Sequence, residues 1–82
     1  SLNNLAGLYD TQGQYAKAEP LYREALRILE KSLPPDHPNL GTVMKNYGAL
    51  LGELNRATEA REWQGKAEAI RQRHTQHNPE AQ

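Results

Sequence analysis

The sequence predicts an all-α fold made of two tandem helix-turn-helix hairpins. Apolar residues recur at steps of three and four in four successive stretches, which is the spacing of an amphipathic helix. Short turn-forming segments separate the two stretches of each pair, so the helices of a pair must run antiparallel. The chain also resembles itself when it is shifted by 42 residues, for example from Asn4 to Asn46, which indicates a repeated structural unit.

Residues 1–33 are expected to form the first hairpin, with helices at about 2–12 and 15–33. Gly13 lies between these helices and suits the left-handed conformation that commonly ends a helix. Pro20 lies inside the second helix, where it removes one backbone hydrogen bond and should bend the helix without ending it. The apolar residues of the two helices are Leu2, Leu5, Ala6, Leu8, Tyr9, Tyr15, Ala18, Leu21, Tyr22, Ala25, Ile28 and Leu29.

Residues 34–39, PPDHPN, are expected to link the two hairpins. The adjacent prolines disfavour helical geometry, whereas Pro38 suits the first turn of a new helix, for which Asp36 is the expected N-cap acceptor. Asp36 and His37 could instead form a catalytic pair. However, neighbouring side chains in a linker rarely face each other, and no serine or cysteine nucleophile lies nearby in the sequence. We therefore interpret the segment as a linker and expect no enzymatic activity.

Residues 40–74 are expected to form the second hairpin, with helices at about 39–54 and 57–74. Asn55 takes the place that Gly13 has in the first hairpin, because Asn also tolerates the left-handed conformation. The apolar residues of this hairpin are Leu40, Val43, Met44, Tyr47, Leu50, Leu51, Leu54, Ala57, Ala60, Trp63, Ala67 and Ile70.

The end of the chain is polar. Apolar periodicity is lost from Arg71 onward, so the last helix is expected to fray near His74 and residues 75–82 to form a loose polar tail. His74 and His77 are three residues apart, a spacing that can bind a metal ion on a helix. No carboxylate or thiolate joins them, so we expect no metal site and no cofactor.

Composition excludes several classes of function. Ten basic and ten acidic residues cancel, so no net charge draws the chain to nucleic acid or to an anionic membrane. The basic residues Arg71, Arg73 and His74 share their helix with Glu62 and Glu68, and no aromatic residue lies among them. No apolar run is long enough to span a membrane, and no signal peptide opens the chain. The absence of cysteine fits a cytoplasmic protein.

The internal repeat depends on residue classes more than on identities. The identical pairs are Asn4 and Asn46, Leu8 and Leu50, Ala18 and Ala60, Ala25 and Ala67, and Ile28 and Ile70. The pairs of similar residues are Leu2 and Met44, Ala6 and Gly48, and Gly13 and Asn55. Small residues therefore fall on small residues and a turn residue on a turn residue, as expected for two copies of one helical hairpin.

The segment LAGLYDTQGQYAKAEPLYREAL, followed by LPPDHPN, resembles a tetratricopeptide repeat of the longer variety found in kinesin light chains and nephrocystin-like proteins. The matching residues are Leu2, Leu5, Ala6, Tyr9, Gly13, Tyr15, Ala18, Tyr22 and Ala25. The resemblance extends over residues 1–74 and is weaker in the second copy, at Leu51, Ala57 and Gln64. It implies that the hairpins form part of a right-handed α-solenoid that binds other proteins.

The resemblance also implies a binding groove. Arrays of this kind line a concave groove with the first helix of each hairpin, where asparagines commonly hold the backbone of a peptide. An amide offers donors and an acceptor, so it can bind an extended main chain whatever its side chains are. The groove residues expected here are Asn3, Asn4, Gly7, Thr11, Lys45, Asn46, Ala49 and Glu53. The alternative is that Asn4 and Asn46 only bind neighbouring backbone or solvent.

A purely architectural role is the second hypothesis. Two hairpins are fewer than the three or so repeats normally needed for independent stability. The isolated chain is therefore expected to self-associate through its exposed ends, by stacking or by swapping a hairpin. The chain does not begin with Met and enters a helical pattern at once, so we expect a piece of a longer protein with further repeats upstream.

Overall fold

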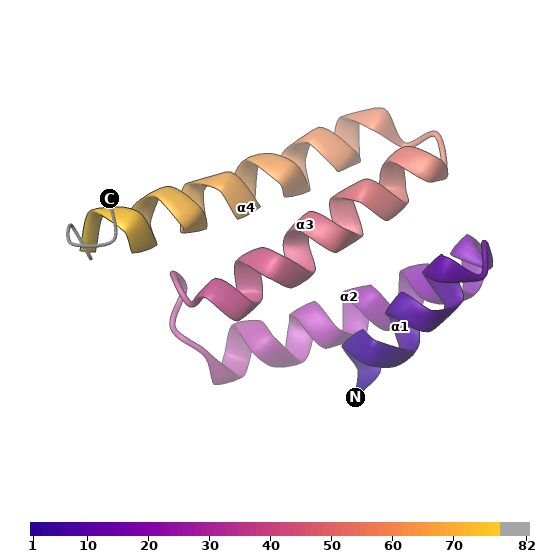
Figure 1. The fold of residues 1–82 in the computed structure, drawn as a ribbon, viewed down its shortest axis with the longest axis horizontal. Helices are drawn as coiled ribbons and strands as arrows, with labels where there is room; N and C mark the ends of the chain where they lie inside the picture. Colours follow the sequence, from indigo (N-terminus) through magenta and orange to yellow (C-terminus); the bar gives the residue numbers. More distant parts are fainter. Residues whose placement is uncertain (78–82) are drawn as a thin grey trace.

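The computed structural model consists of four helices that form two hairpins (Figure 1). The helices are α1 (Leu2–Thr11), α2 (Tyr15–Ser32), α3 (Pro38–Glu53) and α4 (Ala57–His77). The structure describes the backbone of residues 1–77 and the side chains of residues 1–73. No strand occurs in this part of the chain, so the predicted all-α fold class is confirmed. Below, α1 and α2 are called hairpin 1, and α3 and α4 hairpin 2.

The central helix is α3, which lies between α2 and α4 (Figure 1). Since α1 has 10 residues and α2 has 18, α1 covers only the N-terminal half of α2 (Figure 1). The contact between α2 and α3 therefore joins the two hairpins.

Among residues 1–77, no helix combines the length and the apolar composition needed to cross a bilayer.

The two hairpin turns have the same backbone geometry. Gly13 (φ 77°) and Asn55 (φ 61°) both adopt the left-handed conformation, as predicted. In each turn the amide that follows this residue donates to a carbonyl five residues earlier, which closes the end of the first helix. The donors and acceptors are Gln14 with Tyr9 (2.8 Å) and Arg56 with Leu51 (2.9 Å). The two copies of the repeat thus share a backbone hydrogen bond at the turn as well as similar residues.

The helices near the linker begin and end close to the predicted positions. α2 ends at Ser32, one residue earlier than expected, because Leu33 precedes Pro34 and is extended (φ −118°, ψ 154°). α3 begins at Pro38, which occupies the first helical position as predicted. The segment between the helices is therefore 33–37 rather than 34–39.

The predicted fraying of α4 near His74 is wrong, because the helix continues to His77. Loss of apolar periodicity does not by itself end a helix, and the first proline after the apolar stripe is Pro79. The predicted loose tail is therefore wrong for residues 75–77. Residues 78–82 lie outside the described part of the chain.

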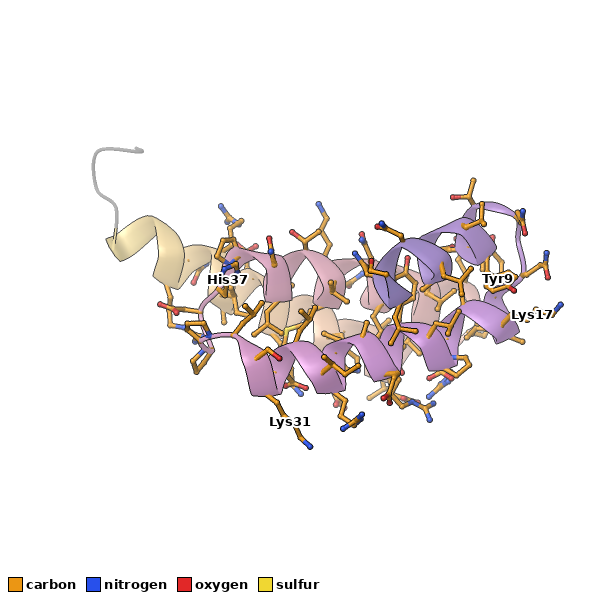
Figure 2. All side chains as sticks on the ribbon, turned by 90° about the horizontal axis from the view of Figure 1, so that it is seen from below. Tyr9, Lys17, Lys31 and His37 are labelled. Carbon is orange, nitrogen blue, oxygen red and sulfur yellow. The ribbon has the colours of Figure 1, made fainter. Side chains whose placement is uncertain are left out.

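The predicted N-cap of α3 is also wrong. His37, not Asp36, precedes the helix with extended backbone, and its Nδ1 accepts a hydrogen bond from the Asn39 amide at 3.1 Å. The N-cap must be the residue next to the first helical position, and Pro38 holds that position. Figure 2 shows His37 at the link between α2 and α3, at the opposite end of hairpin 1 from Tyr9 and Lys17.

Small residues let the helices approach each other closely, as the sequence predicted. Ala6 and Ala18 are fully buried in hairpin 1, and Gly48 and Ala60 are buried in hairpin 2. A Cβ atom on Gly48 would lie 3.2 Å from the Ala60 carbonyl oxygen, so α3 and α4 nearly touch there. The buried hydrophobic residues are Ala6, Ala18, Tyr22, Ala25, Leu26, Leu40, Val43, Met44, Tyr47, Leu50, Leu51, Ala60, Ala67 and Ile70.

Candidate protein-interaction surface

The predicted groove residues all lie on α1 and α3, the first helix of each hairpin. They are Asn3, Asn4, Gly7 and Thr11 on α1, and Lys45, Asn46, Ala49 and Glu53 on α3. Asn3, Gly7 and Asn46 are half-buried, and the others are exposed. Every predicted residue is therefore accessible to a partner, at least in part.

A hollow of about 530 Å³ lies between the start of α1, the second half of α2 and the start of α3. It is lined by Ser1, Leu2, Asn3, Ala25, Ile28, Leu29, Asn39, Thr42 and Val43. We call it the α1–α3 hollow. Asn3 is the predicted groove residue that lines it, and Asn39 and Thr42 were not predicted. The hollow thus combines an apolar floor with amide and hydroxyl groups from both first helices.

Asn39 and Thr42 were missed because they have no counterpart in the first copy. Under the 42-residue shift, their equivalents would precede Ser1. Helical spacing could have found them, since residues 39, 42, 46 and 49 are three or four apart and so lie along one side of α3. Asn46 and Ala49, which were predicted, belong to the same row.

The amide of Asn3 is incompletely satisfied. Its Oδ1 atom is buried and has no hydrogen-bond partner among residues 1–73. A buried acceptor without a donor costs about 1–3 kcal/mol. Asn3 lines the α1–α3 hollow, but Oδ1 itself is shielded from solvent, so a donor in the hollow reaches this oxygen only after the side chain turns toward the hollow.

Two of the predicted residues, Lys45 and Thr11, have surroundings different from those of Asn3. Lys45 lines a second hollow, of about 520 Å³, between α3 and α4, together with Gln64 and Glu68. The Thr11 hydroxyl donates to the Gly7 carbonyl at 2.8 Å, so its proton is used inside α1. The structure therefore brings Asn3 together with Asn39 and Thr42, and places Lys45 on another face of α3.

An ionic cluster around the buried carboxylate of Glu19 connects the two hairpins. The Tyr47 hydroxyl of α3 donates to Glu19 Oε2 of α2 at 2.6 Å, and Arg23 forms an ion pair with the same oxygen. Arg56, in the turn between α3 and α4, lies 3.7 Å from Glu19 Oε2. We call Glu19, Arg23, Tyr47 and Arg56 the Glu19 cluster. Glu19 is the one charged residue buried among residues 1–73.

The Glu19 cluster stabilises the charged carboxylate. Burial opposes ionisation of Glu19, but hydrogen bonds from Tyr47 and Arg23 and the charges of Arg23 and Arg56 outweigh it. The pKa of Glu19 therefore lies below its ordinary value of 4.5. Burial and the hydrogen bond to Glu19 raise the pKa of Tyr47 above 10.0. Local sequence patterns could not have identified this cluster, because Glu19 and Tyr47 are 28 residues apart.

Aromatic residues connect the same helices. The Tyr22 and Tyr47 ring centroids are 6.3 Å apart, and the Tyr47 and Trp63 centroids are 5.3 Å apart in a T-shaped arrangement, with the edge of one ring toward the face of the other. The Tyr22 hydroxyl also donates to Asp10 of α1 at 3.4 Å. Tyr22 and Tyr47 are buried, which confirms that they belong to the core. The row of rings therefore packs α2, α3 and α4 against one another.

His37 was a candidate catalytic residue, and His74 and His77 were candidate metal ligands. His37 uses Nδ1 to cap α3, as described above. Within the described residues, no group of three His, Cys, Asp or Glu side chains could hold a metal ion. The side chains of His74 and His77 lie outside that part of the chain.

A comparison with protein families agrees with this architecture. The model of the tetratricopeptide repeat family matches residues 1–73. The match covers hairpin 1, the linker, hairpin 2 up to residue 73 and all of the predicted groove residues. It therefore includes the α1–α3 hollow and the Glu19 cluster.

Proposed function

Because the chain belongs to the tetratricopeptide repeat family, we propose that it binds an extended peptide of a partner protein along α1 and α3. Repeats of this family generally serve as protein–protein interaction modules, and the family is a non-enzymatic scaffold family. Binding without turnover is therefore the activity to test. The same membership supports an arrangement of the hairpins as part of a solenoid.

The unsatisfied Asn3 oxygen is the observation that supports a peptide ligand. Once the Asn3 side chain turns toward the hollow, a backbone N–H of an extended peptide can donate to its Oδ1, while an apolar side chain of the peptide fills the α1–α3 hollow. Asn39 and Thr42 of α3 also line the hollow, and because the Thr42 hydroxyl donates to the Pro38 carbonyl at 3.2 Å, Thr42 can offer its oxygen only as an acceptor. Asn46, half-buried on the same helix, extends this row.

The test is a titration of the chain with a library of random octapeptides. Asn3→Ala should weaken binding about fivefold, because one hydrogen bond contributes about 1 kcal/mol. The melting temperature should not fall, since the variant removes an unsatisfied acceptor. Gln72→Ala, which removes an exposed amide of α4, is the matched control and should bind as the wild type does. Lower stability of Asn3→Ala with unchanged binding would assign Asn3 to structure.

Asn46 gives a second arm of the same test. We expect Asn46→Ala to weaken peptide binding while the helix content and melting temperature hold, because its amide lies at the surface row of α3. Loss of helicity in Asn46→Ala would assign this amide to the fold instead. If no library peptide binds the wild-type chain, the groove proposal fails.

We further propose that the repeats are of the long variety found in kinesin light chains and nephrocystin-like proteins. The period of 42 residues supports this, since the common repeat of the family has about 34. The proline-rich segment PPDHPN accounts for much of the extra length. The period of any further repeats in the same protein is the check. A period near 42 supports the assignment, and one of about 34 argues against it.

An architectural role is the second candidate function, favoured by exposed apolar residues on hairpin 1. Leu5, Leu8 and Ile28 are the large hydrophobic residues that remain exposed among residues 1–73. In this role the hairpins are spacers that stack on other helical repeats or self-associate through an exposed end. Sedimentation of the isolated chain tests it, because a monomer at all concentrations would contradict self-association.

A further inference from the structure

The two hairpins are joined by the chain at one end of their contact and by polar side chains at the other. The chain passes from hairpin 1 to hairpin 2 through residues 33–37. Both hairpin turns lie at the opposite end of the molecule from this linker (Figure 1). Glu19 is near the start of α2, and a helix rises about 1.5 Å per residue, so the Glu19 cluster lies about 20 Å from the linker along the helix axis. The cluster therefore connects the hairpins at the end where the chain does not.

The contacts of Glu19 are more directional than the apolar contacts beside them. The Tyr47 hydroxyl of α3 donates to Glu19 Oε2 at 2.6 Å, and Arg56 Nη1 lies 3.7 Å from the same oxygen. Arg56 also donates to Glu59 of α4 at 2.9 and 2.6 Å, so its own position is held. Hydrogen bonds weaken steeply when their angle changes, whereas apolar burial depends on area and not on direction. Rotation of one hairpin against the other would thus break these bonds even where it left the apolar area buried.

The buried polar atoms of the Glu19 cluster all have partners. Among residues 1–73, the one buried side-chain atom without a hydrogen bond is Asn3 Oδ1, which is outside the cluster. A fully satisfied buried network favours a single arrangement of the elements that carry it, because any other arrangement leaves a polar group unpaired. The cluster thus has the properties of a contact that selects one orientation.

Neither Glu19 nor Tyr47 is required inside a hairpin. The residue of α4 equivalent to Glu19 is Arg61, and the residue of α1 equivalent to Tyr47 is Leu5. Both hairpins nevertheless have the same backbone geometry at their turns. Glu19 and Tyr47 meet where α2 packs against α3. The cluster therefore belongs to the junction between the hairpins and not to the repeated hairpin itself.

We propose that the Glu19 cluster sets the angle between the two hairpins. The apolar contact of α2 with α3 supplies the buried area, and the cluster selects one orientation of that contact. Because α1 and α3 belong to different hairpins, Glu19, Tyr47 and Arg56 are positioning residues for the candidate surface. The proposal does not depend on peptide binding, since the angle can be measured without a ligand.

The test is a double variant that removes the polar groups and keeps the shape of the junction. Glu19→Met with Tyr47→Phe replaces both partners by apolar groups of similar size. Arg23 and Arg56 stay hydrated, because their side chains are 63% and 36% exposed. The melting temperature should change by less than about 5 °C, since removing both partners of a hydrogen bond is nearly neutral. Tyr47→Phe alone leaves the buried carboxylate without its donor and should lower the melting temperature further.

Distances between pairs of spin labels report the angle. The chain has no cysteine, so labels can be attached at chosen positions. Ala16→Cys with Ala57→Cys labels the two hairpins next to their turns, and Glu30→Cys with Gln72→Cys labels them near the linker; all four residues are exposed. In the double variant the distance distribution at the turns should broaden, while the distribution near the linker stays as in the wild type.

Leu26→Met is the matched control, because it changes a buried residue of α2 without removing a polar group. It should keep the wild-type distance distribution at both ends, whatever its melting temperature. A double variant with the wild-type distribution at the turns would overturn the proposal. So would equal broadening at both ends, equal broadening in Leu26→Met, or loss of helicity in the double variant, which would assign the cluster to stability and not to orientation.

Discussion

Hairpin 1 and hairpin 2 have the same internal geometry but different covering on their outer sides. Ile28 and Ile70 are equivalent residues, yet Ile28 is 40% exposed and Ile70 is 3% exposed. The start of α3 lies against Ile70, since a Cβ on Gly41 would be 3.3 Å from Ile70 Cγ2. Ile28 instead lines the α1–α3 hollow. The environment of a repeated residue thus depends on which element packs beside it.

The second helices, α2 and α4, also differ in exposure, but here the residues of hairpin 1 are buried and the equivalent residues of hairpin 2 are exposed. α2 uses Tyr22 and Leu26 to bury α3, whereas the equivalent Gln64 and Glu68 of α4 are exposed. The side of hairpin 1 that faces hairpin 2 is therefore a packing surface, and the corresponding side of hairpin 2 is polar. A polar outer helix is typical of a terminal repeat, which has no successor to cover it.

Truncation of the equivalent residues 22 and 64 should give the largest contrast. Tyr22→Ala should lower the free energy of unfolding by about 3–5 kcal/mol, because it leaves a large cavity between α1, α2 and α3. Gln64→Ala should change it by less than about 0.5 kcal/mol, since the side chain is exposed. Urea denaturation followed by circular dichroism measures both. Similar effects of the two variants would mean that α4 packs as α2 does.

The hydroxyl of Tyr47 should give the next largest effect, because the equivalent Leu5 has no such group. Tyr47→Phe removes a 2.6 Å hydrogen bond to the buried Glu19 carboxylate and should cost about 1.5–3 kcal/mol. Tyr22→Phe is the control and should cost less, since its bond to Asp10 is 3.4 Å long and only partly buried. Thermal unfolding of both variants checks this. Equal losses would contradict a special role for the Glu19 cluster.

Acid should weaken the junction between the hairpins. The pKa of Glu19 is lowered in the folded chain, so its contribution to stability is complete above about pH 4.5 and is lost as the pH falls through the folded pKa. The melting temperature of the wild type should therefore fall more steeply in this range than that of Glu19→Gln.

Exposed carboxylates also contribute to acid sensitivity and must be separated from Glu19. Arginine partners lower the pKa of Glu24, Glu59 and Glu68 as well. These pairs lie at the surface, where salt screens them more than it screens a buried pair. At high salt the difference between the wild type and Glu19→Gln should persist. Its disappearance would mean that Glu19 is no better shielded than the surface pairs.

The smallest effect should come from Gly65 of α4, whose equivalent in α2 is Arg23. A Cβ on Gly65 would meet no atom within 4 Å, so Gly65→Ala should raise the free energy of unfolding by about 0.5–1 kcal/mol through helix propensity. Gly48→Ala is the control, because its Cβ would lie 2.9 Å from Gln64 Cγ and the gain should be lost. Chemical denaturation of the two variants measures whether the added methyl group stabilises the chain at position 65, where there is room for it, and not at position 48, where there is none.

Much of the fold could be predicted from local patterns. The spacing of apolar residues located all four helices, and the backbone preferences of Gly13 and Asn55 located both turns. Two errors were local as well. His37 took the capping role expected of Asp36, and α4 continued past His74. At the start of α3, the position of Pro38 is a better guide to the cap than the residue type.

The candidate site was predicted less completely than the fold. The predicted residues lie on the expected helices, but only Asn3 lines the α1–α3 hollow. Asn39 and Thr42 were missed because they have no equivalents in the first copy. Lys45 lies with Gln64 and Glu68 instead. Helical spacing shows which residues lie along one side of a helix. It does not show which other helix packs against that side.

The sequence alone determined the helices, the turns and the order of the hairpins, because these depend on the conformational preferences of residues within a few positions of one another. Only the tertiary structure decided which sides are covered: why Leu50 is buried and Leu8 exposed, and why Glu19 remains charged in the core. Burial and ionisation depend on surfaces that meet across long separations, such as the 28 residues between Glu19 and Tyr47.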